Sequence, residues 1–475
     1  MDTELPVGTI DPSGPTRRPR PRWWPAAQVS LLSLMQLMLV IDNSVVNVAL
    51  PTIKQQLGFS AATLSWVITA YALVFGGLVL LSGKIGALIG PRRALLIGAS
   101  VFVVASALGG FAVAPAMLIL ARVLQGVGAA LAAPSTLVLI MAVTAPGPAR
   151  ARAMSLFVIA IGGGVALGLV LGGVLTTGLG WRSVMFINVP IGLAILAGVV
   201  GLSIPEAPRS AARLDVGGAL TSAVAMAALV YGLITAASAG WHDSWVIGSF
   251  ALAAAALVAL VAIERRHPSP VVPPSFFATM RSAAPLLAML LIPAGQFGFL
   301  YFATLFTQTI LGYTPLQTGL AITPFTAALL LANIVTPRLV TRYGERVTGI
   351  LGMTSLLLGL LWMAQLHATS TFISGLLGPF AVLGLGAGLT IAPLTAVIMN
   401  QAPPAHIGVA SSLNQGMQQL GGALGLAVLT TVFAGISPTA GAAQGMTTAL
   451  LIGALFPTGA LILFAIWARR TTGKP

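Results

Sequence analysis

Long apolar segments recur along the whole chain, and they constrain its fold more than any other feature of the sequence. Each runs for roughly 20 residues, the length that an α-helix needs to cross the hydrocarbon core of a bilayer. Charged residues make up only 7% of the 475 residues, against roughly 25% in a soluble domain, so these segments require lipid as their solvent. We therefore predict an all-α polytopic membrane protein with 14 transmembrane helices, approximately at residues 26–49, 63–82, 94–113, 116–142, 153–175, 184–203, 216–235, 245–263, 283–310, 316–336, 348–368, 372–398, 409–434 and 448–468.

The positions of the lysines and arginines predict how these helices are oriented. Loops on the cytoplasmic side of a membrane carry an excess of Lys and Arg. With the N-terminus in the cytoplasm, 20 of the 23 basic residues fall in inner loops or tails, Lys54 and Arg182 fall outside, and Arg122 falls within the fourth helix. We therefore expect a multi-pass protein of the cytoplasmic (inner) membrane with both termini in the cytoplasm. The net charge of +14 belongs to those loops and tails, so it does not indicate a nucleic-acid partner.

An internal repeat divides the chain into two halves. The loop "SGKIGALIGPRRALLIG" (82–98) resembles "TPRLVTRYGERVTGILG" (336–352), "LQGVGAAL" resembles "LGLGAGL" (383–389), and "GVALGL" resembles "GGALGL" (421–426). Parallel repeats of this kind are typical of transporters whose halves rock about a central site. The predicted organisation is a disordered cytoplasmic tail (1–25), a six-helix half (26–203), a linker with two extra helices (204–282), a second six-helix half (283–468) and a cytoplasmic tail (469–475).

Only one acidic residue, Asp42, and one basic residue, Arg122, fall within the predicted helices. A charge at the bilayer centre costs at least ~2.5–3.5 kcal/mol, and intramembrane ionisable residues are functional by default. Burial of Asp42 among apolar neighbours favours its protonated form and brings proton exchange toward neutral pH. The alternatives are a structural carboxylate that holds helix 1 to a neighbour, and an arginine satisfied by backbone carbonyls. We favour proton coupling by Asp42 and Arg122, with Gln125 as a flanking hydrogen-bonding partner.

Polar and aromatic side chains within the helices are candidates for the wall of a substrate cavity. Gln36, Asn43 and Asn47 form a polar stripe beside Asp42 on helix 1, and Met38 shares the face of Asp42. The alternative for the aromatic residues is a lipid-facing or core position. The predicted wall comprises Gln36, Met38, Asn43, Asn47, Trp66, Tyr71, Gln296, Tyr301 and Gln308, with Phe297 and Phe306 as further aromatic candidates.

Glycines and arginines mark two candidate conformational elements. The loop after helix 2 holds a group of motif residues, and helix 5 carries glycines at intervals of four residues, a pattern that lets another helix approach closely. For helix 5, ordinary helix packing and a hinge role both stay open. The residues concerned are Gly83, Gly90, Arg92 and Arg93 in the loop, and Gly164, Gly168, Gly172 and Gly173 in helix 5.

Four stretches carry a resemblance to a known family. They are "IDNSVVNVALP" (41–51) in helix 1, "RVLQGVGAA" (122–130) in helix 4, "GWRSVMFINVPIG" (180–192) at the helix 5–6 junction and "TILGYTPLQTGLAITP" (309–324) at the helix 9–10 junction. With them the chain resembles the major facilitator superfamily, specifically its fourteen-helix drug:proton antiporters. The resemblance implies the major facilitator fold and assigns Arg122 to proton coupling.

The resemblance also implies the function. We expect proton-coupled efflux of hydrophobic or amphipathic small molecules, such as antibiotics, by a monomer embedded in lipid. Two departures stand out: Ala87 and Leu88 replace an aspartate and an arginine of the loop motif, and Leu169 replaces the proline of the helix 5 antiporter motif. An uptake permease or facilitator, and a transport-inactive membrane sensor or scaffold, are the alternatives.

The sequence lacks the residues that several other kinds of functional site require. The absence of cysteine excludes disulfides and thiolate metal sites. No G-x-x-x-x-G-K-[ST] loop is present for ATP. The four histidines fall in loops or at helix ends and form no ligand cluster, and no activated nucleophile is visible. We therefore expect no enzyme activity, no cofactor and no metal.

Overall fold

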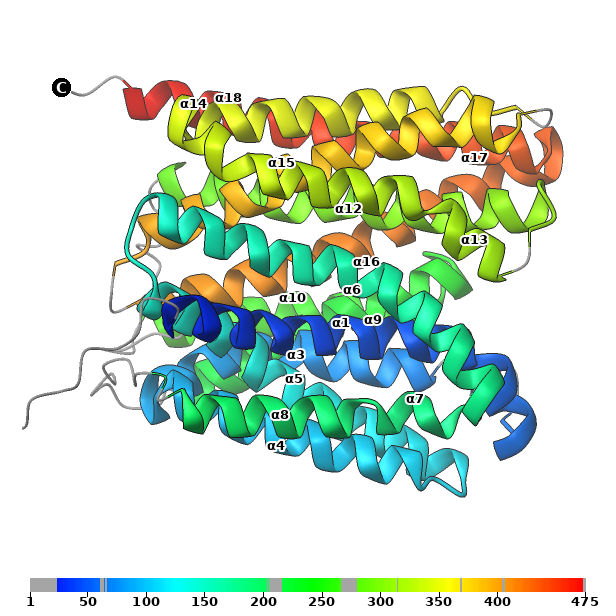
Figure 1. The fold of residues 1–475 in the computed structure, drawn as a ribbon. Coiled ribbons are helices and arrows are strands. Elements are labelled where there is room, and N and C mark those ends of the chain that lie inside the picture. The colour runs from blue at the N-terminus through cyan, green and yellow to red at the C-terminus, as the bar shows by residue number, and fades with distance from the viewer. Residues whose placement is uncertain are drawn as a thin grey trace, which may run out of the picture.

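The computed structural model describes residues 24–472 except 60–63, 65, 203, 205–215, 266–279, 314, 368–369 and 404–405. The predicted tail 1–25 therefore lies almost entirely outside the described residues. Every regular element in the described part is helical, as predicted, and the helices lie side by side in one bundle (Figure 1). They are α1 Trp24–Leu57, α3 Trp66–Ile89, α4 Pro91–Gly110, α5 Pro115–Val143, α6 Pro148–Leu179, α7 Arg182–Phe186, α8 Asn188–Gly201, α9 Val216–Ala239, α10 Ser244–Glu264, α12 Met280–Thr309, α13 Pro315–Ala321, α14 Thr323–Met363, the π-helix η1 Phe372–Leu376, α15 Leu377–Gln401, α16 Ile407–Ala440, α17 Ala442–Gly453 and α18 Leu455–Thr472.

Most of these helices are long and apolar enough to cross a membrane. In the described part of the chain 11 satisfy that test, or 12 if the two parts of α6, which meet at 45°, count as one span. The longest, Gln317–Met363, has 47 residues and covers two of the predicted spans, and Leu220–Ala236 falls among the shorter apolar helices. The all-α polytopic architecture is confirmed, and the count of 14 stays a prediction.

A pair of glycines shows that the sequence repeat is also a structural repeat. Gly90 has φ +95° and directly precedes α4. Its counterpart in the second half, Gly344, has φ +82° and breaks α14 into two helices. Glycine adopts this left-handed region without the steric penalty that a Cβ brings, so both halves make the same sharp turn between consecutive helices.

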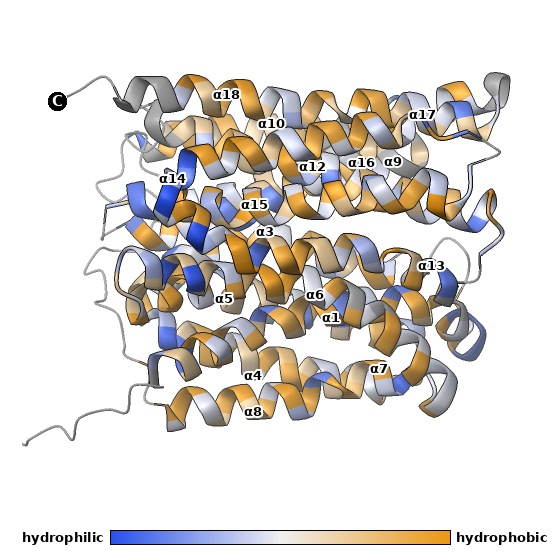
Figure 2. Cartoon of the chain, turned by 45° about the horizontal axis from the view of Figure 1, so that its top comes forward, coloured by the Kyte–Doolittle hydropathy of each residue, from blue (hydrophilic) through white to orange (hydrophobic). Residues whose placement is uncertain are grey.

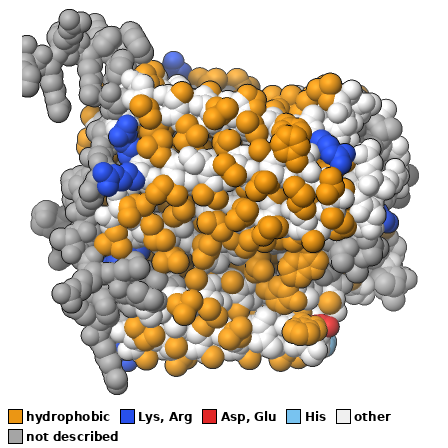
Figure 3. All heavy atoms as spheres, turned by 90° about the horizontal axis from the view of Figure 1, so that it is seen from below, with side chains coloured by type: hydrophobic (Ala, Val, Ile, Leu, Met, Phe, Trp, Pro, Cys, Tyr) orange, Lys and Arg blue, Asp and Glu red, His pale blue; other side chains and the backbone are white. Residues whose placement is uncertain are grey.

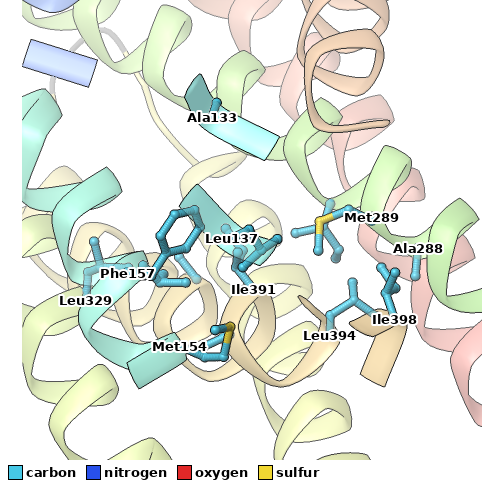
Figure 4. Close-up of a cluster of buried hydrophobic side chains, with 14 of the residues drawn as sticks. Ala133, Leu137, Met154, Phe157, Ala288, Met289, Leu329, Ile391, Leu394 and Ile398 are labelled. Atoms are coloured by element: carbon cyan, nitrogen blue, oxygen red, sulfur yellow. The ribbon is translucent and has the colours of Figure 1, made fainter. Parts of the chain in front are cut away.

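The two halves occupy opposite sides of the bundle, with the N-terminal half in blue to green and the C-terminal half in light green to red (Figure 1). A buried apolar cluster joins them: it takes Leu137 and Phe157 from α5 and α6, and Met289, Leu329 and Ile391 from α12, α14 and α15 (Figure 4). The start of α1 and the end of α18 lie at the same end of the bundle (Figure 1), as an even number of crossings requires.

The inserted helices α9 and α10 lie along one seam between the halves. A Cβ on Gly77 of α3 would stand 3.0 Å from the Ala227 Cβ of α9, and a Cβ on Gly416 of α16 would stand 3.3 Å from the Met226 Cε of α9. The helix α9 therefore packs on both halves at once.

The outer surface is apolar along the middle of the bundle. Large hydrophobic side chains such as Val104, Leu120 and Ile247 are more than half exposed. Hydrophobic residues run along the helices (Figure 2), and they spread over the face drawn in Figure 3 with the visible lysines and arginines near its ends. Contiguous exposed apolar surface on this scale is suited to lipid rather than to water.

Candidate functional site

The intramembrane carboxylate predicted from the sequence lies in a closed polar cluster. Asp42 on α1 and Arg122 on α5 are both fully buried, and Arg122 Nη1 lies 2.5 Å from Asp42 Oδ2. The other carboxylate oxygen, Oδ1, accepts hydrogen bonds from Gln125 Nε2 at 2.9 Å and from Asn188 Nδ2 at 2.7 Å. A buried ion pair needs further hydrogen bonds to its remaining groups; the two amides supply them to Asp42 Oδ1, whereas Arg122 Nη2 is buried without a partner.

The guanidinium of Arg122 is held by groups on two further sides. Its Nε donates to the Val67 carbonyl of α3 at 2.9 Å, and its Nη1 also donates to Gln125 Oε1 at 2.7 Å. The Tyr71 ring lies 4.5 Å from the guanidinium carbon, a cation–π distance. This arginine therefore contacts both the carboxylate of α1 and the backbone of α3.

Small residues on α5 make this arrangement possible. A Cβ on Gly126 would stand 2.9 Å from the Tyr71 carbonyl oxygen, so α5 and α3 approach closely only because that side chain is absent. Arg122 lies one helical turn before Gly126 on α5. The close approach of the two helices therefore brings the Val67 carbonyl of α3 within reach of the Arg122 side chain. The Gly126 of the "RVLQGVGAA" motif is therefore part of how the arginine is positioned.

A cavity of about 290 Å³ lies between the two halves beside this cluster. Its apolar wall includes Phe75, Val158 and Leu300, and Tyr71 separates the cavity from Arg122. The polar residues that line it come from both halves: Gln36, Asn43, Ser44 and Tyr71 from the first, and Gln296, Thr326, Gln415, Gln418 and Gln419 from the second. Cavities of this kind, mainly apolar with a few polar groups, are typical small-molecule sites.

The structure divides the predicted cavity residues into two groups. Gln36, Asn43, Tyr71 and Gln296 line the cavity, as does Phe297. The others lie elsewhere: Met38 and Phe306 are buried in the core, Asn47 and Gln308 are exposed, Trp66 faces Tyr231 of α9, and Tyr301 is 40% exposed.

Several residues of the site were not predicted. Asn188, which bonds Asp42, stands within the helix 5–6 motif, and Ser106 accepts a bond from Gln125 Nε2 at 2.8 Å. Three glutamines of α16 complete the cavity wall. The sequence signal for these glutamines was the amide run "NQGMQQ" (414–419) inside an apolar segment. Polar side chains are costly in lipid, so this run, like Asn43, is expected to face a polar surrounding.

The glycines of α6 pack against α1. Cβ atoms on Gly164, Gly168 and Gly172 would stand 2.6–3.1 Å from Val40, Ser44 and the Val45 carbonyl, whereas Gly173 has open space. Close packing against α1 is therefore their structural role, and α6 also bends by 45° between Val165 and Val170.

The two halves meet at the end of the bundle that carries Gly83, which lies within α3 rather than in the predicted loop, because that helix runs on to Ile89. A Cβ on Gly83 would overlap Ser412 Oγ of α16, and the neighbouring Ser411 Oγ donates to the Pro134 carbonyl of α5 at 2.8 Å. Of the other predicted loop residues, Gly90 makes the turn into α4, Arg92 is half-buried and Arg93 is exposed.

A second contact between the halves lies at the same predicted cytoplasmic end. Arg150 Nη1 at the start of α6 donates to Asn400 Oδ1 at 3.1 Å, and Asn400 Nδ2 donates to Glu345 Oε1 at 3.2 Å. The first bond joins the halves at the end where the sequence predicts the inner loops, and the second, within the C-terminal half, holds the Asn400 side chain.

Comparison with known proteins agrees with this geometry. The model of the Major Facilitator Superfamily matches residues 32–426, and the chain belongs to that superfamily, as its motifs predict. It is 36% identical to the puromycin resistance protein pur8 of Streptomyces alboniger, over 98% of this chain and 93% of that protein. It is 38% identical to the cephamycin export protein CmcT of Amycolatopsis lactamdurans, over 83% of this chain and 82% of that protein. The human organic anion transporter MFSD10 (TETRAN) shares the fold, with a TM-score of 0.68 at 14% identity over 94% of this chain and 100% of that one.

The described residues contain no group of three or more His, Cys, Asp or Glu that could hold a metal ion. In the described part of the chain, the charged residues beside the cavity are Asp42 and Arg122, and they lie behind Tyr71 of its wall.

Proposed function

We propose that this protein exports hydrophobic or amphipathic small molecules, antibiotics among them, across the cytoplasmic membrane in exchange for protons. The observation that carries the proposal is the fully buried Asp42–Arg122 pair directly behind the wall of a cavity between two repeated halves. The names of similar proteins, which refer to puromycin resistance and cephamycin export, support the direction and the substrate class.

Proton coupling follows from what protonation does to the cluster. The charged Asp42 carboxylate holds Arg122 and Gln125 of α5 and Asn188 of α8 against α1. Protonation removes the charge that compensates the guanidinium, and the strongest of these bonds weaken because charge-assisted bonds are roughly twice as strong as neutral ones. The packing of α1 on α5 then changes, and α1 carries cavity residues such as Gln36 and Asn43.

The available energy is sufficient. At ~150 mV one proton moved inward supplies ~3.5 kcal/mol, enough for a roughly 300-fold substrate gradient. We propose further that the protein acts as a monomer with both termini in the cytoplasm. The cavity and the charged cluster are both complete within one chain, which supports the first point, and the distribution of basic residues supports the second.

The test is proton release from purified protein on addition of substrate, with the uncharged chloramphenicol as the first probe and puromycin, which carries an amine, as the second. The expected result is stoichiometric release by the natural protein and none by Asp42→Asn. Asp243→Asn is the matched control, since Asp243 is half-buried at the start of α10, away from the charged pair, and caps that helix through a bond to the Trp245 amide that asparagine can also accept. Proton release that persists in Asp42→Asn would place the coupling site elsewhere.

A further inference from the structure

We propose that the cavity selects molecules without net charge and holds them by amide hydrogen bonds from both halves. The inference rests on the proposed function, since it names the substrate class of the same cavity.

The first observation is the absence of charge in the wall. Among the described residues that line the cavity, none is Asp, Glu, Lys, Arg or His. An ion that leaves water needs an opposite charge or several strong hydrogen bonds to offset its lost hydration. A charged substrate would therefore enter this cavity without a counter-charge in its wall.

The nearest carboxylate is already engaged. Asp42 has no exposed surface, and its two oxygens accept bonds from Arg122, Gln125 and Asn188. The Tyr71 ring, which lines the cavity, lies against the guanidinium of Arg122. A cationic substrate would have to displace this tyrosine and compete with Arg122 to reach the carboxylate.

The second observation is a pair of unpartnered amide atoms, one from each half. Gln36 Oε1 on α1 and Gln415 Nε2 on α16 are buried atoms without a hydrogen-bond partner in the protein. Their side chains are 8% and 5% exposed, and both line the cavity. A buried polar atom without a partner is costly, so these two amides are poised for a ligand that offers both a donor and an acceptor.

The two observations together define the ligand. It has an apolar body for the wall formed by residues such as Phe75, Leu300 and Phe325, and uncharged hydroxyl, amide or carbonyl groups for Gln36 and Gln415. Because the two glutamines belong to opposite halves, such a ligand bridges the parts that must move relative to one another. Exchange of an uncharged molecule for one proton moves one positive charge inward, so a membrane potential alone drives the export.

The experiment compares the binding of two probes to the purified protein in lipid nanodiscs. Chloramphenicol is uncharged and carries an amide and hydroxyl groups, and tetraphenylphosphonium is a permanent cation of apolar surface. We expect chloramphenicol to bind and tetraphenylphosphonium to bind at least about tenfold more weakly. Equal or tighter binding of the cation, or no binding of chloramphenicol, overturns the inference.

Two variants at one position sharpen the comparison. Gln415→Glu supplies the missing counter-charge and should improve binding of tetraphenylphosphonium about tenfold, whereas Gln415→Leu should not improve it and should weaken chloramphenicol binding about tenfold, the effect of ~1.4 kcal/mol. If Gln415→Glu does not fold, Gln36→Glu serves the same purpose from the other half. A cation that binds no better to either glutamate variant contradicts the proposed role of charge.

The inference and the proposed function fail in different ways. Probe selectivity is measured at equilibrium and does not depend on proton coupling. Selectivity for chloramphenicol together with unchanged proton release in Asp42→Asn would refute the coupling and keep the inference. Proton release that depends on Asp42 together with preferred binding of the cation would do the reverse.

Discussion

Corresponding positions in the two halves carry side chains of different kinds: charged in the first half and aromatic in the second. Arg122 lies four residues before Gly126, and Phe380 lies four residues before Gly384, the corresponding glycine of the repeated motif. Tyr71 and Phe325 also correspond in the repeat, because they are the same number of residues apart as Gly90 and Gly344. Where the first half has a charged pair beside a tyrosine, the second half has three buried phenylalanines.

The aromatic cluster of the second half is compact. The Phe299 ring of α12 lies 5.2 Å from the ring of Phe380 on α15 and 5.2 Å from that of Phe325 on α14. Like Asp42, Phe299 stands on the first helix of its half. The comparison teaches that the repeat preserves how helices pack, through small residues and tight turns, and leaves the chemistry of the buried side chains free to differ. The buried charged pair therefore belongs to the first half, while the second contributes Phe325 and four glutamines to the cavity.

The largest expected effect comes from breaking the charged pair on one side only. Arg122→Leu leaves Asp42 buried without its partner, and the loss of one member of a buried ion pair typically costs ~3–5 kcal/mol. The double variant Asp42→Asn/Arg122→Leu has no charge to desolvate and should regain most of this stability without regaining transport. Denaturant unfolding in detergent measures both. A double variant no more stable than the single one would show that the pair is not held as a buried ion pair.

A second prediction concerns the amide that makes the first half's cluster complete. Asn188→Ala removes one donor from the Asp42 carboxylate, and a hydrogen bond to a charged group is worth ~1.5–3 kcal/mol. The loss weakens the contact that joins α8 to α1, so we expect the free energy of unfolding in detergent to fall by a similar amount, measured by denaturant titration. Asn47→Ala is the control, since its amide is exposed and donates to the Asn43 carbonyl; an equal change in both variants would argue against a specific role of Asn188.

The aromatic cluster should respond differently. Phe380→Leu replaces a fully buried aromatic side chain with a smaller apolar one. The free energy of unfolding should fall by about 1 kcal/mol. Because Phe380 packs on the Phe299 ring rather than on the charged pair, the pH dependence of proton release should stay unchanged. A shift of that profile would mean that the second half also takes part in proton coupling, and the contrast between the halves would be lost.

The smallest effect is expected where the two halves meet at the predicted cytoplasmic end. Asn400→Ala removes the bonds to Arg150 and Glu345, which are exposed and contribute less than about 1 kcal/mol. Opening at that end should nevertheless become more frequent, by about twofold. The natural chain has no cysteine, so Ala396→Cys at this contact can be labelled with an impermeant maleimide from the inner side. Labelling that is no faster in the presence of Asn400→Ala would show that these bonds do not restrain the halves.

The membrane-crossing helices of this protein can be predicted from its sequence, because each segment enters lipid according to its own hydrophobicity. Hydrophobicity over about 20 residues is a local property, so the apolar segments predict membrane-crossing helices without reference to any other part of the chain. The same holds for the rarity of charge in these segments, which singled out Asp42 and Arg122. The sequence repeat also aligned Gly90 with Gly344, and both make a tight turn in the structure, because the need for a positive φ is also local.

The tertiary structure decided which side of each helix meets which neighbour. Asp42 is met by Arg122, 80 residues away, and by Asn188, 146 residues away, and no periodicity within one helix specifies such partners. For the same reason Trp66 and Tyr301, expected in the cavity, face away from it, while Gln415 and Gln418 line it. In a chain that is apolar on nearly all sides, the hydrophobic pattern does not distinguish a lipid-facing side from a buried one. That distinction comes from the close packing of small residues between helices, which only the folded bundle brings together.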